Sequence, residues 1–133
     1  MSTTSPRDLI LKANRAVASA QLLRRAGDID GACNRPYSTM FDAAKAALLT
    51  VKIGGDPMVG KTHSGLISAF GMHLVKTGFV PAEFGRAFNR THDIRQVADY
   101  TGDLIELDQL DSLIKLASEF VEWMNSRVIS KSD

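Results

Sequence analysis

Cysteine is almost absent from this sequence, since Cys33 is the single one among 133 residues. One thiol excludes a disulfide within the chain and a zinc site built from cysteines. The chain also has no apolar run of about 18 residues, the length that a membrane-spanning helix needs. Its polar beginning lacks the apolar stretch of a signal peptide. These absences predict a soluble, cytoplasmic protein with no membrane association.

A charge excess of either sign is missing too. Lys and Arg total 16 against 15 Asp and Glu, which leaves a formal net charge of +1. This balance gives no overall attraction to nucleic acid, although a local basic patch remains compatible with it. Hydrophobic residues make up 44% and charged residues 23%, close to globular averages. We expect residues 1–133 to form a single domain, with residues 1–4 and 130–133 flexible.

Apolar residues recur at helical spacing along most of the chain, and no segment alternates apolar and polar residues as a strand would. These stripes cover residues 9–23, 29–51, 66–75, 84–98 and 107–128. Typical helix-start residues precede three of them (Ser5 with Pro6, Thr62 and Pro81), and helix-stop glycines follow at Gly27, Gly78 and Gly102. The sequence therefore predicts an all-α, up-and-down bundle of four to five helices.

Pro36 falls inside the second stripe, which continues through it without a change of phase. A proline in a helix interior removes one hydrogen bond and costs about 3 kcal/mol. Either one helix is kinked at Pro36, or a new helix begins near Asn34 after a separate turn. The continuous stripe favours the kinked helix.

The spacings of common catalytic and metal centres are absent or out of context. His63, His73 and His92 are not spaced as metal ligands, so we expect no metal and no cofactor. Residues 55–62 formally match the phosphate-loop pattern G-x-x-x-x-G-K-T, but a predicted helix precedes them where that motif needs a buried strand. We interpret them as a loop leading to a helix cap at Thr62. Cys33 lies on an apolar stripe, as a packing cysteine does.

Polar residues gather at the ends of the predicted helices, and we expect them to converge. They are Asn34, Arg35, Lys61, Thr62, His63, Arg95, Asp99 and Tyr100. Arg95 and Asp99 are one helical turn apart and can form an ion pair. The set is either a network that holds helix ends together or a binding site, in which Lys61 and the helix start at Thr62 would hold an anion.

Three sequence blocks carry a resemblance to a known family. Residues 32–49 (ACNRPYSTMFDAAKAALL) resemble the pattern A-x-N-R-x-Y-Y-A-x-F-x-A-x-x-A-L-L. Residues 61–70 are similar to T-H-x-G-L-I-x-x-F, and residues 95–100 to R-x-x-A-D-Y. All three patterns are those of the HEPN family, in its small stand-alone bacterial and archaeal members. The blocks occur in the family's order with similar gaps, and the resemblance covers nearly the whole chain.

This resemblance implies an α-helical up-and-down bundle that dimerises and has a nucleotide- or RNA-related role. Many HEPN proteins are endoribonuclease toxins encoded beside a small nucleotidyltransferase antitoxin. Their catalytic signature is an arginine followed four to six residues later by a histidine, placed at the groove between two subunits. In this sequence the seventh residue after Arg35 is Asp42, whereas Arg86 is followed by His92 at the family's distance.

Two functional hypotheses follow. The first is a metal-independent endoribonuclease toxin, in which an arginine stabilises charge on the phosphate and a histidine moves protons. Its candidate pairs are Arg35 with His63, or Arg86 with His92, while Asn34, Lys61, Thr62, Arg95, Asp99 and Tyr100 bind the ligand. The second is a non-catalytic, dimeric HEPN module that binds a nucleotide, RNA or a partner protein. Sequence alone leaves both open.

Overall fold

The computed structural model of the chain describes residues 5–51, 62–102 and 105–129. Lys61, the predicted loop before it and both predicted flexible ends lie outside these residues. The described residues form the helices α1 (Pro6–Arg25), α2 (Ile29–Cys33), α3 (Arg35–Thr50), α4 (His63–Phe70), α5 (Ala82–Thr101) and α6 (Leu107–Met124). Short π-helical turns, η1 (Gly71–Val75) and η2 (Asn125–Ile129), extend α4 and α6. The predicted all-α bundle is confirmed.

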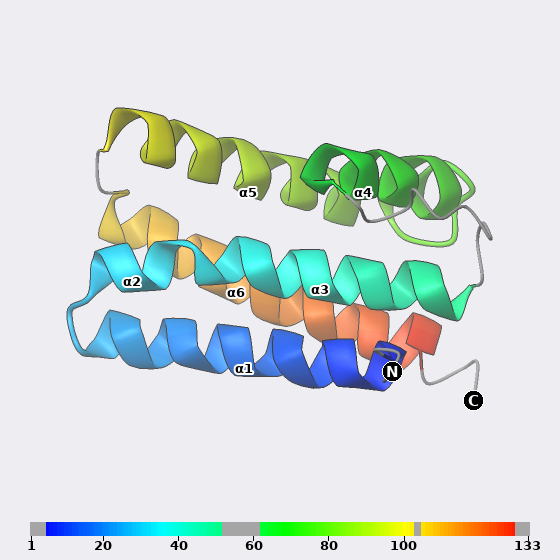
Figure 1. Cartoon of the computed structure of the whole chain (residues 1–133), viewed down its shortest axis with the longest axis horizontal. Coiled ribbons are helices and arrows are strands. Elements are labelled where there is room, and N and C mark those ends of the chain that lie inside the picture. Colours follow the sequence, from blue (N-terminus) through cyan, green and yellow to red (C-terminus); the bar gives the residue numbers. More distant parts are fainter. Residues whose placement is uncertain (1–4, 52–61, 103–104, 130–133) are drawn as a thin grey trace.

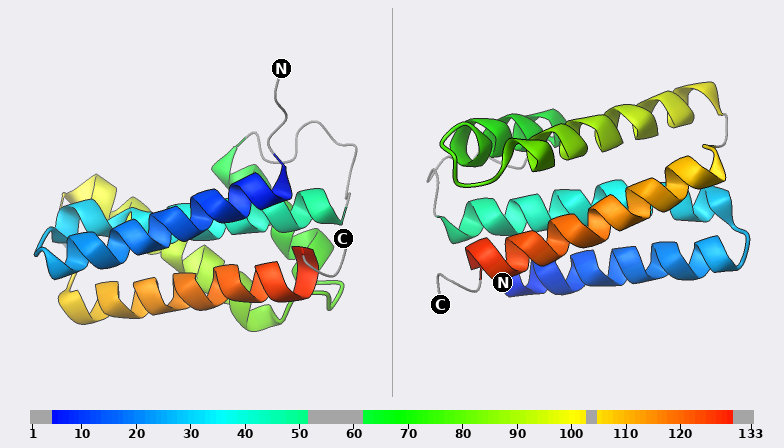
Figure 2. Two further views of the ribbon diagram at one scale, coloured as in Figure 1. Left: turned by 90° about the horizontal axis from the view of Figure 1, so that it is seen from below. Right: turned by 180° about the vertical axis from the view of Figure 1, so that it is seen from behind.

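The helices lie roughly along one axis in two groups (Figure 1). α1, α3 and α6 contact one another, and α1 and α6 lie side by side on the face away from α5 (Figure 2). α4 and α5 lie on the other side of α3, and both contact it. Because α3 lies between the two groups, its side chains are buried nearly all round, and alanines fill much of its surface. Large buried rings, including Tyr37, Phe70, Phe88 and Phe120, fill the space beneath α4 and α5.

The predicted helix ends are confirmed where the structure describes them. The Ser5 hydroxyl accepts the Asp8 N–H at 3.1 Å, and the Asp8 carboxylate accepts the Ser5 N–H at 3.2 Å, which is a reciprocal capping box. Gly27, Gly78 and Gly102 all have positive φ angles, between 75° and 85°, a conformation that residues with a Cβ adopt at a cost.

The single kinked helix through Pro36 is wrong. α2 ends at Cys33, and α3 begins at Arg35 with Pro36 in its first turn. In the first turn of a helix the missing proline N–H has no intrahelical partner to lose, so proline is well tolerated there. The stripe nevertheless keeps its phase, because the two helices run nearly in line (Figure 1).

The apolar stripe predicted along residues 84–98 is buried only in its first half. Phe88 and Thr91 are buried, whereas the Val97 side chain is 61% exposed. From Ile94 onward, the apolar side chains of α5 instead line a groove of about 860 Å³ against the beginning of α6. Within the described ranges, no helix has the length and apolar character needed to cross a membrane.

Candidate functional site

The ring of Tyr37 lies at the centre of the polar residues that the fold brings together. Its side chain is 1% exposed, yet two imidazoles and a guanidinium surround it. The His63 and His92 rings lie 5.5 and 5.2 Å from the Tyr37 ring, measured between centroids. The Arg95 guanidinium carbon lies 5.1 Å from the same centroid, in cation–π geometry. We call Tyr37, His63, His92 and Arg95 the Tyr37 cluster.

Three helices supply the Tyr37 cluster. Tyr37 belongs to α3, and His63 is the first residue of α4. The Thr62 hydroxyl fixes the start of α4 by accepting the Gly65 N–H at 2.9 Å, so the predicted cap is confirmed. His92 and Arg95 are three residues apart on α5, a spacing that places both on one face of the helix.

A short hydrogen bond links Tyr37 to His63. The Tyr37 hydroxyl oxygen lies 2.8 Å from Nδ1 of His63. Burial raises the pKa of Tyr37 to about 12, against a smaller opposing effect of Arg95, so the hydroxyl stays protonated near neutral pH. Burial lowers the pKa of His63, and the positive charge of Arg95 and the proximity of His92 lower it further. These effects favour the neutral imidazole of His63, which is the form that can accept a proton.

Arg95 is anchored but incompletely paired. Its Nε lies 3.6 Å from a carboxylate oxygen of Asp99, within ion-pair range but beyond hydrogen-bond range. This Nε is buried and has no hydrogen-bond partner among the described residues. A buried N–H donor without an acceptor is costly, and a bound anion would supply the acceptor.

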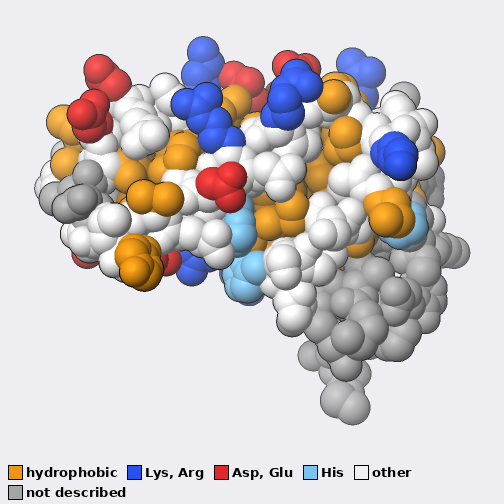
Figure 3. Space-filling model, turned by 90° about the horizontal axis from the view of Figure 1, so that it is seen from above, with side chains coloured by type: hydrophobic (Ala, Val, Ile, Leu, Met, Phe, Trp, Pro, Cys, Tyr) orange, Lys and Arg blue, Asp and Glu red, His pale blue; other side chains and the backbone are white. Residues whose placement is uncertain are grey.

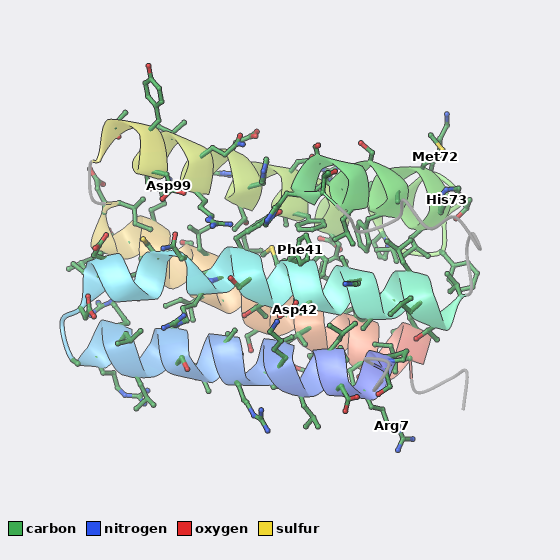
Figure 4. The ribbon with its side chains drawn as sticks, in the orientation of Figure 1. Arg7, Phe41, Asp42, Met72, His73 and Asp99 are labelled. Carbon is green, nitrogen blue, oxygen red and sulfur yellow. The ribbon has the colours of Figure 1, made fainter. Side chains whose placement is uncertain are left out.

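A cavity of about 200 Å³ adjoins the cluster on the side of α1. It is lined by Lys12, Tyr37, Ser38, Phe41, Asp42 and His63. Figure 4 shows Phe41 and Asp42 as neighbours on α3, with Asp42 on the side toward α1. Asp42 is only 7% exposed. Burial raises the pKa of its carboxyl group, while Lys12 and Lys45 act in the opposite direction.

The structure brings together only part of the predicted convergent set. His63 and Arg95 meet at Tyr37, and Asp99 pairs with Arg95. Tyr100, by contrast, is 93% exposed. Asn34 and Arg35 are exposed at the junction of α2 and α3, and no ring contact or ion pair of the described residues involves either side chain. Arg35 therefore lies near Tyr37 in sequence but outside the Tyr37 cluster.

The arginine that lies beside His92 is not the one that the family spacing predicts. Arg86 is exposed, and six residues along a helix make about 1.7 turns, which leaves the two side chains about 120° apart around the axis. Arg95, three residues after His92, shares its face and its contact with Tyr37. Tyr37 itself has the periodicity of a core residue. Its place in the N-R-x-Y block was the one sequence signal for a further role.

Cys33 has the features of a packing residue. Its thiol donates to the Asp30 carbonyl oxygen at 3.0 Å and is partly buried. Burial raises the pKa of the thiol, and the negative charge of Asp30 raises it further, so the thiolate is disfavoured. Across the described segments, no three His, Cys, Asp or Glu side chains are grouped closely enough to hold a metal ion.

On the surface, the cluster opens on the α4–α5 side of the molecule. Figure 3 shows histidine side chains in the middle of this face, beside apolar side chains and an acidic group. Lys and Arg side chains lie along one edge of the same face. His63 is the exposed member of the cluster, whereas His92 is only partly exposed, so a ligand would approach by way of His63.

Comparison with known proteins gives a consistent result. The family model described as the HEPN domain matches residues 6–127. The chain is 31% identical over 115 residues to a UPF0332 protein of Gloeobacter violaceus, covering 86% of this chain and 87% of that protein. It is 32% identical over 114 residues to a Methanocaldococcus jannaschii protein named "Putative toxin MJ0605", covering 86% and 81% of the two chains. A second protein of that organism, named "Putative toxin MJ0142", is 30% identical over 125 residues, covering 93% and 82%.

Proposed function

The chain belongs to the HEPN domain family, and from this premise we propose that it is a toxin-type module that cleaves RNA at the Tyr37 cluster. The toxin names of two similar proteins support the biological setting. The observation that carries the chemistry is the hydrogen bond between Tyr37 and His63, with Arg95 on the same tyrosine ring. Together these two contacts place the Arg95 guanidinium close to an imidazole of fixed orientation.

The proposed reaction is attack of a ribose 2′-oxygen on the adjacent phosphorus. His63 accepts the 2′-hydroxyl proton through Nε2, in the tautomer in which Nδ1–H donates to the Tyr37 oxygen. The 5′-oxygen leaves as its bond to phosphorus breaks, and His92 is the candidate donor of the proton that it takes up. The products are a 2′,3′-cyclic phosphate and a 5′-hydroxyl. Arg95 stabilises the charge that develops on the phosphate oxygens.

This proposal keeps His63 from the sequence-based pair and replaces Arg35 with Arg95. Arg95 lies over Tyr37 and has a buried donor without a partner, two features that Arg35 lacks. Asp99 positions Arg95 by pairing with it across one helical turn. Thr62 contributes by fixing the start of α4, and with it the backbone of His63.

We further propose that the active form is a homodimer joined through the groove between α5 and α6. The groove has an apolar lining, and Val97, Tyr100 and Leu107 are exposed close to it in sequence. Val97 follows Arg95 by two residues on α5, about 200° around the helix axis, so a second copy bound there would lie on the side of α5 opposite the Tyr37 cluster. As a toxin the dimer would need a partner that restrains it, and the resemblance implies a small nucleotidyltransferase.

The test is cleavage of a labelled single-stranded RNA by the purified chain in buffer with EDTA. We expect a 2′,3′-cyclic phosphate product, and a loss of about 100-fold or more in rate for both His63→Ala and Arg95→Ala. His73→Ala is the matched histidine control, because no ring contact or ion pair of the described residues involves its side chain. Arg35→Ala and Arg86→Ala are the arginine controls, and we expect all three controls to stay within a few-fold of wild type.

The second candidate is a non-catalytic module that binds a nucleotide, RNA or a partner protein. The Arg95–Asp99 pair favours it, because a paired arginine is less free to follow a changing phosphate charge. RNA binding without cleavage, weakened by Arg95→Ala, would support this second function and rule out the nuclease. Cleavage with full activity in both His63→Ala and Arg95→Ala would place the chemistry elsewhere.

A further inference from the structure

We propose that the cavity lined by Lys12, Ser38, Phe41 and Asp42 is a subsite for a guanine base of the RNA. This inference rests on the proposed action on RNA and adds a base preference to it. The cavity shares Tyr37 and His63 with the Tyr37 cluster. A base held there would bring its own ribose and phosphate to His63.

The size and walls of the cavity suit one planar heterocycle. Its volume of about 200 Å³ is below the roughly 300–1,000 Å³ of pockets that take larger ligands. Phe41 and His63 form its aromatic wall, with ring centroids 4.8 Å apart. Unstacked RNA bases bind by stacking on such side chains while polar groups read their edges.

The polar groups select guanine among the four bases. The buried Asp42 carboxylate is an acceptor for two N–H groups, and Lys12 supplies a donor. Guanine presents two adjacent donors, N1–H and the N2 amino group, beside the acceptor O6, which matches this pair. Uracil offers one donor on that edge, while adenine and cytosine offer an amino group next to an unprotonated ring nitrogen that would face the carboxylate.

The lack of bonding partners for the polar groups of the cavity, among the described residues, supports the same conclusion. Across the described segments, neither Asp42 nor Lys12 forms a hydrogen bond or an ion pair, although Lys12 and Lys45 lie close enough to lower the pKa of Asp42 against the effect of its burial. Ser38 donates its hydroxyl proton to the Asn34 carbonyl at 3.2 Å, so its oxygen remains an acceptor toward the cavity. The Asp42 carboxylate therefore faces the cavity as an acceptor without a hydrogen-bond donor, and the two guanine N–H groups would supply its donors.

The experiment measures binding of RNA pentamers that contain four uridines and one central test base. Every ribose is 2′-O-methylated so that cleavage is blocked, and binding is followed by fluorescence anisotropy. We expect the guanine pentamer to bind at least about fivefold more tightly than those with adenine, cytosine or uracil. Inosine, which lacks only the N2 amino group, should lose most of that preference.

Two variants connect the preference to the cavity. Asp42→Asn should abolish it, because an amide cannot accept both guanine donors, and Lys12→Met should weaken it without touching the core. Asp111→Asn is the control, since Asp111 pairs with Arg24 outside the cavity. Melting temperatures show whether each variant is folded. If Asp42→Asn does not fold, the effect of Lys12→Met on the guanine preference is the test.

The outcomes separate this inference from the proposed function. Equal binding of all test bases, or preference for a base other than guanine, overturns the guanine subsite. A guanine preference that survives both Asp42→Asn and Lys12→Met places the recognition elsewhere and overturns it as well. If no pentamer binds, the subsite is also rejected, and the separate cleavage assay then decides whether the chain acts on RNA.

Discussion

The hydroxyl oxygen of Tyr37 lies 2.8 Å from Nδ1 of His63, and this bond joins the middle helix of the bundle to the first residue of α4. Tyr37 is buried, whereas His63 is exposed. The bond therefore connects the rigid core to a side chain that ligands can reach. A catalytic imidazole needs this kind of support, because its ring must hold one orientation throughout the reaction.

Replacing Tyr37 with Phe keeps the ring and removes the hydroxyl. We expect a loss of about 1 kcal/mol in the free energy of unfolding, the usual net value of one such hydrogen bond. RNA cleavage should fall by about tenfold or more, because the His63 ring loses its anchor. Chemical denaturation and the cleavage assay measure the two effects. Tyr100→Phe is the control and should change neither quantity, since that side chain is 93% exposed. Unchanged cleavage in Tyr37→Phe would show that the bond has no catalytic role.

The lowered pKa of His63 predicts a pH profile. Cleavage should decline as the pH falls through a pKa below 6.5, where the His63 imidazole becomes protonated and no longer accepts a proton. NMR titration of the His63 ring measures that pKa directly. Arg95→Gln should raise it by removing a nearby positive charge, and Arg15→Gln on α1 should leave it unchanged. A pKa of 6.5 or higher in the wild-type chain would contradict the prediction.

The same shift predicts how stability depends on pH. The unfolded chain takes up a proton at His63 near pH 6.5, while the folded chain resists it to lower pH. Stability should therefore decrease as the pH falls from about 6.5 to the folded pKa. Denaturation curves across this interval measure the effect, and His63→Gln should reduce the slope. The same slope in His63→Gln and in wild type would assign the effect to other groups.

Much of the fold could be predicted from the sequence, because local signals determine it. The capping box at Ser5 and the glycine stops act within a few residues, and the apolar stripes need only helical periodicity. The predictions that are wrong concern features that depend on how one helix packs against another. Val97 continues a stripe, but α5 diverges from α6 there, and a groove remains where burial was expected.

The candidate site was predicted less completely. His63, Arg95 and Asp99 were selected as polar residues at helix ends, and the structure brings them together. The sequence does not predict Tyr37 as their centre, because a buried aromatic residue on an apolar stripe has the same pattern whether or not its hydroxyl forms a hydrogen bond. The family spacing predicts Arg86 as the partner of His92, although three residues on a helix bring side chains closer than six do.

Pro36→Ala tests the corrected position of the helix break. If Pro36 lay in a helix interior, its replacement by alanine would raise the free energy of unfolding by about 3 kcal/mol. In the first turn of α3 that gain disappears, and the substitution loses buried ring contacts and makes the unfolded chain more flexible. We therefore expect stability to fall by about 0.5–1 kcal/mol in urea denaturation. A gain of 2 kcal/mol or more would show that the helix continues through Pro36.

The proposed dimer can be tested at Val97, whose side chain is 61% exposed at the groove between α5 and α6. A dimer with two-fold symmetry uses the same patch twice, so Val97→Arg would place two charges in one apolar interface. We expect the dissociation constant to rise by about 100-fold, equivalent to about 2.7 kcal/mol. Light scattering at micromolar concentration should then show a dimer for wild type and a monomer for the variant.

Leu22→Arg on α1, equally exposed but far from the groove in sequence, should remain a dimer. Val97 is exposed, so Val97→Arg should leave the fold of each single chain intact. The monomeric variant should therefore still show the melting temperature of a folded protein. A wild-type chain that is monomeric at this concentration would rule out the dimer, and a Val97→Arg variant that still dimerises would place its interface on another face.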